Sequence, residues 1–376
     1  MARGIAKIVG KFAKRPIWLI GENLGEVAQD NGFAFFEYCV KNNKPEKHYY
    51  VSTENNKNME NLKPYPNKIL KYNSFKHLVM YCLSQYLIVS HGIRDVIPSI
   101  VHNKMGSNPK KVIYLQHGII AMKKLSFNRN SYNGMIKKFV VSSQHEKNIL
   151  INDMNFKPNQ VMVTGLSRFD FLVDRSKNNE TREILLIPTW REWIVSSRDE
   201  FLASEFYTHY NDLLQDKKLH SMLEDNNLLL KFFPHIEIQK KYKDDFASSS
   251  DRIQIVQLGQ ESMKELIQNS SLMITDYSSV VFDFGYLEKP IIFYQFDLEE
   301  YLRNRGSYVN LKEDLIGDTA YTKDEVIQHI TKYIENDFNY KPKYLIKSKK
   351  YYAYRDKNNN KRIYNEIKKL SVKKSN

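Results

Sequence analysis

Cysteine is scarce in this sequence. Only Cys39 and Cys82 occur among its 376 residues. These two form neither the framework of a disulfide-bonded secreted domain nor the closely spaced pairs that bind a structural metal ion. We therefore expect a protein of the reducing cytoplasm, with no cysteine-based metal site.

Long apolar runs are also missing. The longest stretch, residues 78–89, is interrupted by Ser84 and Gln85, so it cannot span a bilayer. A run at residues 17–20 follows a basic N-terminal stretch but lacks the length of a secretory signal core. The sequence predicts neither a membrane-spanning helix nor a signal peptide.

Acidic residues are outnumbered by basic ones, 43 to 57, which gives a formal net charge of +14. The excess lies at the two ends, because residues 1–15 carry a net charge of +5 and residues 341–376 a net charge of +11. A basic protein can bind nucleic acid, but no nucleic-acid-binding module or Gly/Arg-rich run is recognisable here. We therefore expect no nucleic acid partner.

The basic N-terminal stretch has an amphipathic pattern. Ile5, Ile8, Val9 and Phe12 would lie on one face of a helix, with basic side chains around it. Such a helix binds an anionic membrane surface. Packing of the same helix against the protein itself is the alternative.

The sequence does contain enough apolar material for two cores, with 42% apolar and 13% aromatic residues. Its length predicts two domains. Strands and helices alternate along the chain, which predicts α/β domains with parallel sheets covered by helices. The predicted strands lie at residues 17–20, 48–52, 68–72, 86–90, 112–115, 138–141, 160–163, 183–187, 228–232, 253–257, 272–275 and 290–294.

A polar stretch at residues 174–182 divides this alternation into two halves. We predict a basic amphipathic segment (1–15), two doubly wound domains (16–175 and 176–340) and a basic helical tail (341–376). The predicted helices include residues 31–42, 74–84, 143–152, 201–216, 262–268 and 280–287. Functional sites of doubly wound domains lie beyond the carboxyl ends of the strands. Polar residues that directly follow a strand are therefore the candidates.

The strand–helix–strand unit at residues 272–301 carries the strongest signal. Its first strand runs into Asp276, Tyr277, Ser278 and Ser279, and an apolar helix begins directly afterwards. First-turn amides of a helix lack partners and the helix dipole favours an anion, so this position suits a phosphate group. The alternative is that Asp276 or Ser278 only caps the helix.

Two histidines are candidates for a general base. His117 follows a predicted strand and precedes Gly118, which would let a ligand approach the backbone closely. Imidazole can accept a proton from a hydroxyl group near neutral pH. His91 also follows a strand and competes for the same role, while a structural histidine at the start of a loop is the alternative for either.

Further polar residues follow strands in the second half. Thr189 and Arg191 offer a hydroxyl and a guanidinium group, which suit phosphate oxygens. Arg191 could instead pair with a carboxylate. The remaining candidates lie at the ends of two other strands, namely Lys231, His235, Gln260 and Glu261. Together these clusters predict one anionic ligand in the second half.

Several of these motifs resemble the CDP-glycerol glycerophosphotransferase family, the primases and polymerases of teichoic acid. The resemblance extends over about residues 17–370. It rests on the run TDYSSVVFDF from Thr275, the run KPIIFY from Lys289, and three short motifs: Gln116-His117-Gly118, Pro188-Thr189-Trp190-Arg191 and Arg305-Gly306.

The resemblance implies a GT-B fold, in which two facing Rossmann-like domains enclose an interdomain cleft. It also implies transfer of glycerol phosphate, or a related polyol phosphate, from CDP-glycerol or another CDP-polyol. The acceptor would be a hydroxyl group of a lipid-linked glycan or polyol phosphate, CMP would leave, and the product would be teichoic acid or a capsule-type polymer. No metal or other cofactor is implied, and the enzyme would attach peripherally to the inner face of the cell membrane.

The same resemblance implies roles for particular residues. His117 would be the general base, and Ser278 and Ser279 would hold the donor pyrophosphate, with Thr189 and Arg191 nearby. The family places another histidine before a proline at this site, where this sequence has Phe233. His235, directly after Pro234, is therefore the candidate for that contact. Beside these carried-over roles, Asp276 and Lys231 are candidates for the donor site, and the further candidates are Gly118, His91, Gln260, Glu261 and Arg305.

Two other functions compete with this one. A GT-B glycosyltransferase that uses a UDP- or GDP-sugar would share the fold and the strand-end sites. A non-catalytic basic module that binds membranes or nucleic acid would explain the charged ends. It would not explain the polar clusters after the strands.

Overall fold

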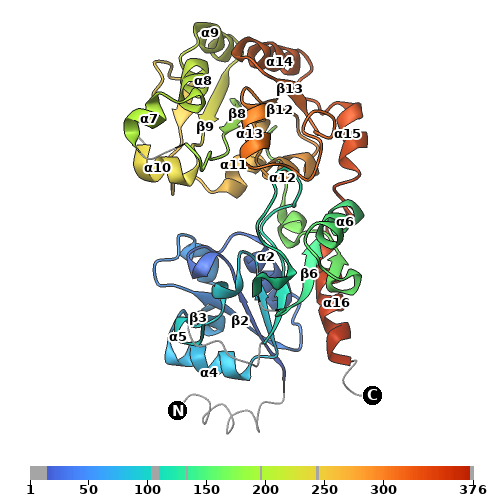
Figure 1. Cartoon of the computed structure of the whole chain (residues 1–376). Helices are drawn as coiled ribbons and strands as arrows, with labels where there is room; N and C mark the ends of the chain where they lie inside the picture. The colour runs from blue at the N-terminus through green and yellow to red at the C-terminus, as the bar shows by residue number, and fades with distance from the viewer. Residues whose placement is uncertain (1–14, 103–109, 133, 195–196, 243–244, 373–376) are drawn as a thin grey trace. The chain divides into compact units, whose positions relative to one another are not determined.

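The computed structural model describes residues 15–102, 110–132, 134–194, 197–242 and 245–372. The amphipathic N-terminal helix predicted around Ile5–Phe12 lies outside these residues. The chain divides into two compact units (Figure 1). The first unit comprises residues 1–119, 125–171 and 350–376, and the second comprises residues 120–124 and 172–349.

The first unit is built on a parallel seven-stranded sheet in the order β3-β2-β1-β4-β5-β6-β7. Its strands are β1 (Ile17–Gly21), β2 (Lys47–Ser52), β3 (Ile69–Lys71), β4 (Tyr86–Val89), β5 (Lys111–Tyr114), β6 (Ile136–Val141) and β7 (Val161–Val163). Its helices are α2 (Asn31–Lys41), α3 (Met59–Leu62), α4 (Phe75–Leu83), α5 (Ser99–His102), α6 (Gln144–Asn152) and α16 (Asn359–Val372). Short 3-10 turns occupy Asn23–Gly25, Pro66–Lys68, Ile93–Asp95, Arg129–Tyr132, Pro158–Gln160 and Ser167–Phe171.

The second unit holds a parallel six-stranded sheet in the order β10-β9-β8-β11-β12-β13. Its strands are β8 (Arg182–Ile187), β9 (Leu228–Phe232), β10 (Ile253–Ile255), β11 (Ser270–Thr275), β12 (Ile291–Tyr294) and β13 (Asp318–Ala320). Its helices are α7 (Arg198–Leu202), α8 (Glu205–Leu214), α9 (Lys217–Asp225), α10 (Ile236–Tyr242), α11 (Met263–Asn269), α12 (Val281–Tyr286), α13 (Leu298–Asn304), α14 (Lys323–Glu335) and α15 (Pro342–Ser348). The predicted α/β class is confirmed in both units.

The central strands of both sheets are apolar on both faces, as a parallel sheet covered by helices requires. Every residue of β1, β4, β11 and β12 is buried. Burial of each large apolar side chain contributes about 1.5–3 kcal/mol to folding. These runs therefore fix the strand positions and leave polar residues for the strand ends.

Two elements differ from the sequence prediction. The helix predicted at residues 201–216 is two helices, because the Ser204 hydroxyl accepts the Tyr207 amide at 3.2 Å and starts α8 after a break. Strand β13 was not predicted, because it has only three residues and the apolar pattern of a strand is weak there.

The basic C-terminal tail is divided between the units. Its last helix, α16, belongs to the first unit, where Figure 1 shows it in red among blue and green elements. The Lys368 ammonium lies 2.5 Å from the Glu46 carboxylate, and the Tyr364 hydroxyl donates to the same carboxylate at 3.0 Å. The amides of Asn359 and Asn360 donate to Asp170. Part of the positive charge of the tail therefore forms ion pairs within the first unit, as Lys368 does with Glu46.

Candidate active site

In the first unit, the two candidate histidines lie together. His91 follows β4 and His117 follows β5, which are neighbouring parallel strands. Their rings stack with centroids 5.0 Å apart and an angle of 13° between the planes. His117 is exposed, while Gly118 beside it is buried. The two candidates that the sequence could not rank therefore form one imidazole pair.

A carboxylate and an arginine hold this pair. The Asp30 carboxylate lies 3.6 Å from Nε2 of His91 and 2.7 Å from the Arg168 guanidinium. The same guanidinium donates to the His117 carbonyl at 2.5 Å. The Asn23 amide donates to Nδ1 of His91 at 3.3 Å, so the proton of the neutral ring is on Nε2, facing Asp30.

The backbone around both histidines is also fixed from within the unit. The Asp95 carboxylate accepts the amides of Ser90, His91 and Gly92 at 2.9 to 3.1 Å. Gln116 has a φ of +52°, a left-handed conformation that is costly for a residue with a side chain. The buried Asn31 side chain donates to the Gln116 carbonyl at 2.8 Å. The strained residue directs the following His117 outward.

Glu22 lies under this cluster and is fully buried. Its carboxylate accepts the amides of Gln29, Asp30 and Phe33 at 2.7 to 2.9 Å. Burial raises the pKa of Glu22 to about 8, the negative charge of Asp30 adds to the rise, and the three amides reduce it.

This pKa predicts a pH dependence of stability. A folded-state pKa above the unfolded value means that the contribution of Glu22 is fully present below about pH 4.5 and is lost as the pH rises through about 8. The free energy of unfolding should fall over this window, measured by urea denaturation. The variant Glu22→Gln should show a smaller fall. Parallel curves for the two proteins would contradict the raised pKa.

In the second unit, Asp276 and Arg191 form the centre of a buried ionic network. The Arg191 guanidinium donates to Asp276 at 2.9 Å and binds both carboxylate oxygens of Asp297 at 2.7 and 3.0 Å. Asp276 also accepts the Thr189 amide at 2.9 Å and the Tyr210 hydroxyl at 2.9 Å. The structure thus shows the carboxylate pairing that the sequence left open for Arg191.

Aromatic rings enclose the guanidinium. Its carbon lies 4.9 Å from the Tyr277 ring centre, 5.4 Å from that of Phe206 and 5.5 Å from that of Tyr301. Neither Arg191 nor Asp276 is exposed. Burial works against the charged form of Arg191, but Asp276 and Asp297 outweigh it and raise its pKa. These residues lie beneath the strand-end surface and support it.

Ser278 and Ser279 lie at that surface, directly after the buried Asp276 and Tyr277, and are half-buried. Helix α12 starts at Val281, and no side chain caps it. The Ser278 hydroxyl accepts the Val280 amide at 3.3 Å. Within the described part of the chain, the amides of Ser278 and Ser279 donate to no protein acceptor. Two hydroxyls and two amide donors are therefore available to a ligand.

Two other predicted residues border this surface. The Thr189 hydroxyl is buried and has no hydrogen-bond partner among the described residues. The His235 ring stacks on Trp190 with centroids 6.4 Å apart. Burial lowers the pKa of His235, and among its charged neighbours Lys123 and Lys240 lower it while Glu237 and Asp276 raise it. His235 is thus a neutral ring near neutral pH.

The remaining predicted residues are engaged elsewhere in the second unit. Lys231 is buried and pairs with Glu183 at 3.0 Å and with Glu261 at 2.8 Å. The Gln260 side chain accepts the Gln257 amide at 2.7 Å and so holds its own turn. Arg305 pairs with Glu192. The structure gives these side chains protein partners, whereas Ser278 and Ser279 keep open donors.

Sequence reasoning missed the partners of both centres. No role was predicted for five of them, namely Asp30, Asp95, Arg168, Tyr210 and Asp297. Asp297 had a usable signal, because it lies three residues beyond the end of β12. Arg168 had none, since its contacts with Asp30 join positions 138 residues apart.

The described residues lack two features that could have pointed to other functions. No helix among them is both long and apolar enough to cross a membrane. They also contain no group of three or more His, Cys, Asp or Glu side chains arranged to hold a metal ion.

Comparison with known proteins identifies the family of the chain. A sequence profile of the family described as CDP-glycerol:poly(glycerophosphate) glycerophosphotransferase matches residues 7–369. The minor teichoic acid biosynthesis protein GgaB of Bacillus subtilis is 30% identical over 100% of this chain and 42% of its own length. The teichoic acid poly(glycerol phosphate) polymerase of Bacillus spizizenii is 24% identical over 89% of each chain.

A solved structure of the wall teichoic acid polymerase TagF superposes with a TM-score of 0.68. It is 16% identical, and the match covers 100% of this chain and 94% of that one. This likeness confirms the two-domain GT-B fold. The chain spans 42%, 57% and 40% of the length of three curated relatives that it matches.

Proposed function

Because this chain belongs to the CDP-glycerol:poly(glycerophosphate) glycerophosphotransferase family, we propose that it transfers glycerol phosphate from CDP-glycerol. The acceptor is a hydroxyl group of a lipid-linked glycan or polyol phosphate, and CMP is released. The observation that carries this proposal is the family match over residues 7–369, which includes both strand-end centres.

The imidazole pair supports a role in proton abstraction. His117 is exposed after β5, and Arg168 holds its carbonyl at 2.5 Å. In the proposed reaction the His117 ring takes the proton of the acceptor hydroxyl as its oxygen attacks the β-phosphorus of CDP-glycerol. The bond from that phosphorus to the bridging oxygen breaks, and CMP carries away the electron pair. His91, oriented by Asp30 at 3.6 Å, positions the base.

The open donors at Ser278 and Ser279 support a role in donor binding. Their amides and hydroxyls would bind the pyrophosphate oxygens, and the Thr189 hydroxyl, unpartnered in the described structure, would add a third side-chain donor. Such donors stabilise the charge that develops on the leaving CMP. Arg191 and Asp276 act from below by holding the turn, and the proposed reaction uses no cofactor.

The direct test offers the pure protein several donors together with a lipid-linked acceptor. We expect CMP release with CDP-glycerol or CDP-ribitol and an acceptor that gains polyol phosphate. Release of UDP or GDP from a nucleotide sugar, with no turnover of CDP-polyols, would favour a glycosyltransferase. Salt-sensitive binding to DNA or vesicles without any turnover would favour a non-catalytic module.

We also propose that the protein works on the inner face of the cell membrane, where a lipid-linked acceptor would lie. Supporting this are the net charge of +5 in residues 1–15 and of +11 in residues 341–376. Basic segments of this kind are attracted to anionic lipid surfaces. Fractionation of cells that express the tagged protein tests the location, and release by high salt is the expected result.

The double variant Ser278→Ala, Ser279→Ala should weaken donor binding at least about tenfold, since each hydrogen bond to a charged group contributes about 1.5–3 kcal/mol. The backbone donors remain, so binding should not vanish. Isothermal titration with CDP-glycerol measures the effect. Ser221→Ala, on the exposed face of α9, is the matched control and should bind normally. Unchanged affinity in the double variant would remove the serines from the donor site.

A further inference from the structure

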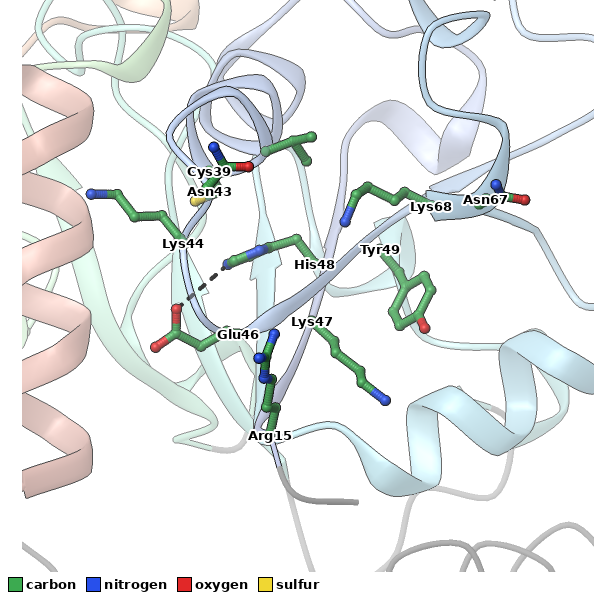
Figure 2. Close-up of a pocket in the computed structure, with 11 residues that line it drawn as sticks. Arg15, Cys39, Asn43, Lys44, Glu46, Lys47, His48, Tyr49, Asn67 and Lys68 are labelled. Carbon is green, nitrogen blue, oxygen red and sulfur yellow. Dashed lines mark ion pairs between the residues drawn. The ribbon is translucent and has the colours of Figure 1, made fainter. Parts of the chain in front are cut away.

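A cavity of about 470 Å³ opens in the first unit (Figure 2), and neither His91 nor His117 lines it. Its wall combines the C-terminal end of α2 with residues that precede or begin β1, β2 and β3. His91 and His117 follow the ends of β4 and β5 in the same parallel sheet. The cavity therefore lies at the amino edge of the sheet, and the proposed acceptor chemistry lies at its carboxyl edge.

Positive charge dominates this cavity. Arg15, Lys47 and Lys68 line it, and within the described ranges none of the three pairs with a carboxylate. Lys44 also lines it, with its ammonium 4.5 Å from the Tyr364 ring centre. Lys44, too, has no acidic partner among the residues that the structure describes.

Among the described residues, Glu46 is the one acidic side chain in the wall, and it already has partners. Glu46 receives the Lys368 ammonium at 2.5 Å and the Tyr364 hydroxyl at 3.0 Å, both from α16. These contacts lower the pKa of Glu46, although burial opposes the shift. The negative charge of Glu46 is therefore compensated by α16 and does not neutralise the lysines of the cavity.

An unsatisfied polar group lies in the wall of the cavity. His48 is 2% exposed, and its Nε2 has no hydrogen-bond partner in the part of the chain that the structure describes. The nearest carboxylate oxygen, on Glu46, is 3.9 Å away, which exceeds hydrogen-bond length; Figure 2 marks this pair with a dashed line. Burial lowers the pKa of His48 to about 4, and Lys68 contributes to the shift. A buried polar atom without a partner needs an explanation, and a bound polar group is one that fits a cavity wall.

We propose that this cavity binds the phosphate group of a phosphomonoester or phosphodiester. Arg15, Lys47 and Lys68 supply the charge at the rim, and His48 supplies a neutral ring nitrogen in the wall. The volume exceeds that of a bare phosphate ion and leaves room for a small substituent such as glycerol. A phospholipid headgroup and a soluble polyol phosphate both present this chemistry. The site does not touch the proposed reacting atoms and stands independently of the proposed function.

The test follows His48 in the full-length protein labelled with [¹³C]histidine. Inorganic phosphate is titrated at constant ionic strength, with chloride as the reference, and the variant His48→Gln assigns the resonance. We expect a saturable shift of the His48 signal. The double variant Lys47→Gln, Lys68→Gln should weaken phosphate binding at least about tenfold, because two charge-assisted contacts are lost.

The matched control is Lys76→Gln, Lys137→Gln, which removes the same charge from two exposed lysines of the first unit that lie outside the cavity and have no acidic partner in the described ranges. It should bind phosphate normally. Circular dichroism checks that both double variants fold. The absence of a saturable shift, or equal weakening in the two double variants, would overturn the proposal.

Vesicles then separate the two sources of the phosphate. Cosedimentation is measured with phosphatidylglycerol vesicles, with phosphatidylcholine as the neutral reference. If the cavity variant loses more binding than the control variant, the ligand is a lipid headgroup. If both variants bind vesicles alike while the cavity variant has lost phosphate binding, the ligand is a soluble phosphate ester. Either result retains the site and assigns its source.

Discussion

Replacing His117 with alanine should lower the turnover of CDP-glycerol by about two to four orders of magnitude, the usual contribution of a positioned general base. Donor affinity should stay the same, because His117 belongs to the first unit and the proposed donor contacts to the second. Steady-state CMP release gives kcat, and titration with CDP-glycerol in the absence of acceptor gives the donor Kd. A large fall in kcat with an unchanged Kd is the expected pattern.

The matched control for this variant is His91→Ala, because the two rings stack at 5.0 Å and differ in their partners. His91 is held by the Asn23 amide and by Asp30, which suits a positioning residue. We expect a smaller loss of kcat than for His117→Ala. A larger loss in His91→Ala would transfer the role of base to that residue. Near-normal turnover in both would remove the imidazole pair from the chemistry.

The fold could be predicted from the sequence because its signal is local. Each central strand is a short apolar run, and the neighbouring helices begin at recognisable caps such as Ser143, whose hydroxyl accepts the Glu146 amide. Local signals fail where an element is short, as in β13, or where one residue divides a helix, as Ser204 does between α7 and α8. The residues on both sides of such a break favour a helix, so helix propensity alone predicts one continuous helix there.

The candidate site was predictable only in part. Parallel strands place their carboxyl ends at one edge, so the sequence brought His91 and His117 to the same edge without ranking them. It could not supply Arg168, because the pairing with Asp30 spans 138 positions and depends on how the chain folds back. Nor could it show which polar residues point outward. Lys231 and Ser278 both lie near strand ends. Lys231 pairs with Glu183, whereas the Ser278 amide donates to no acceptor among the described residues.

Arg191 illustrates the same limit. From the sequence, a guanidinium after a strand suits a phosphate as well as a carboxylate. Asp297, 106 positions away in the sequence, is the partner in the structure. Its carboxylate accepts two hydrogen bonds from the Arg191 guanidinium in a site closed to solvent. Through its pair with Asp276, Arg191 holds the segment that leads into Ser278 and Ser279.

Arg191→Met should therefore destabilise the protein strongly. The change leaves Asp276 and Asp297 buried without their cation, and loss of one partner from a buried pair costs about 3–5 kcal/mol. Urea denaturation, followed through the unfolding transition of the second unit, measures the loss of unfolding free energy. In the fraction that folds, donor affinity should also fall, because Asp276 holds the Thr189 amide at 2.9 Å and precedes the serine turn. Arg191→Lys should recover part of the stability, since one charge returns without the bidentate geometry.

Two further variants separate charge from shape. Adding Asp276→Asn and Asp297→Asn to Arg191→Met removes the unpaired charges, so the triple variant should be more stable than Arg191→Met alone. Lys312→Gln breaks an exposed pair with Glu299 in the same unit and should change stability little. If Arg191→Met were as stable as Lys312→Gln, the buried network would not hold the serine turn. If the triple variant regained stability but not donor affinity, the ionic geometry itself would be what orients Ser278 and Ser279.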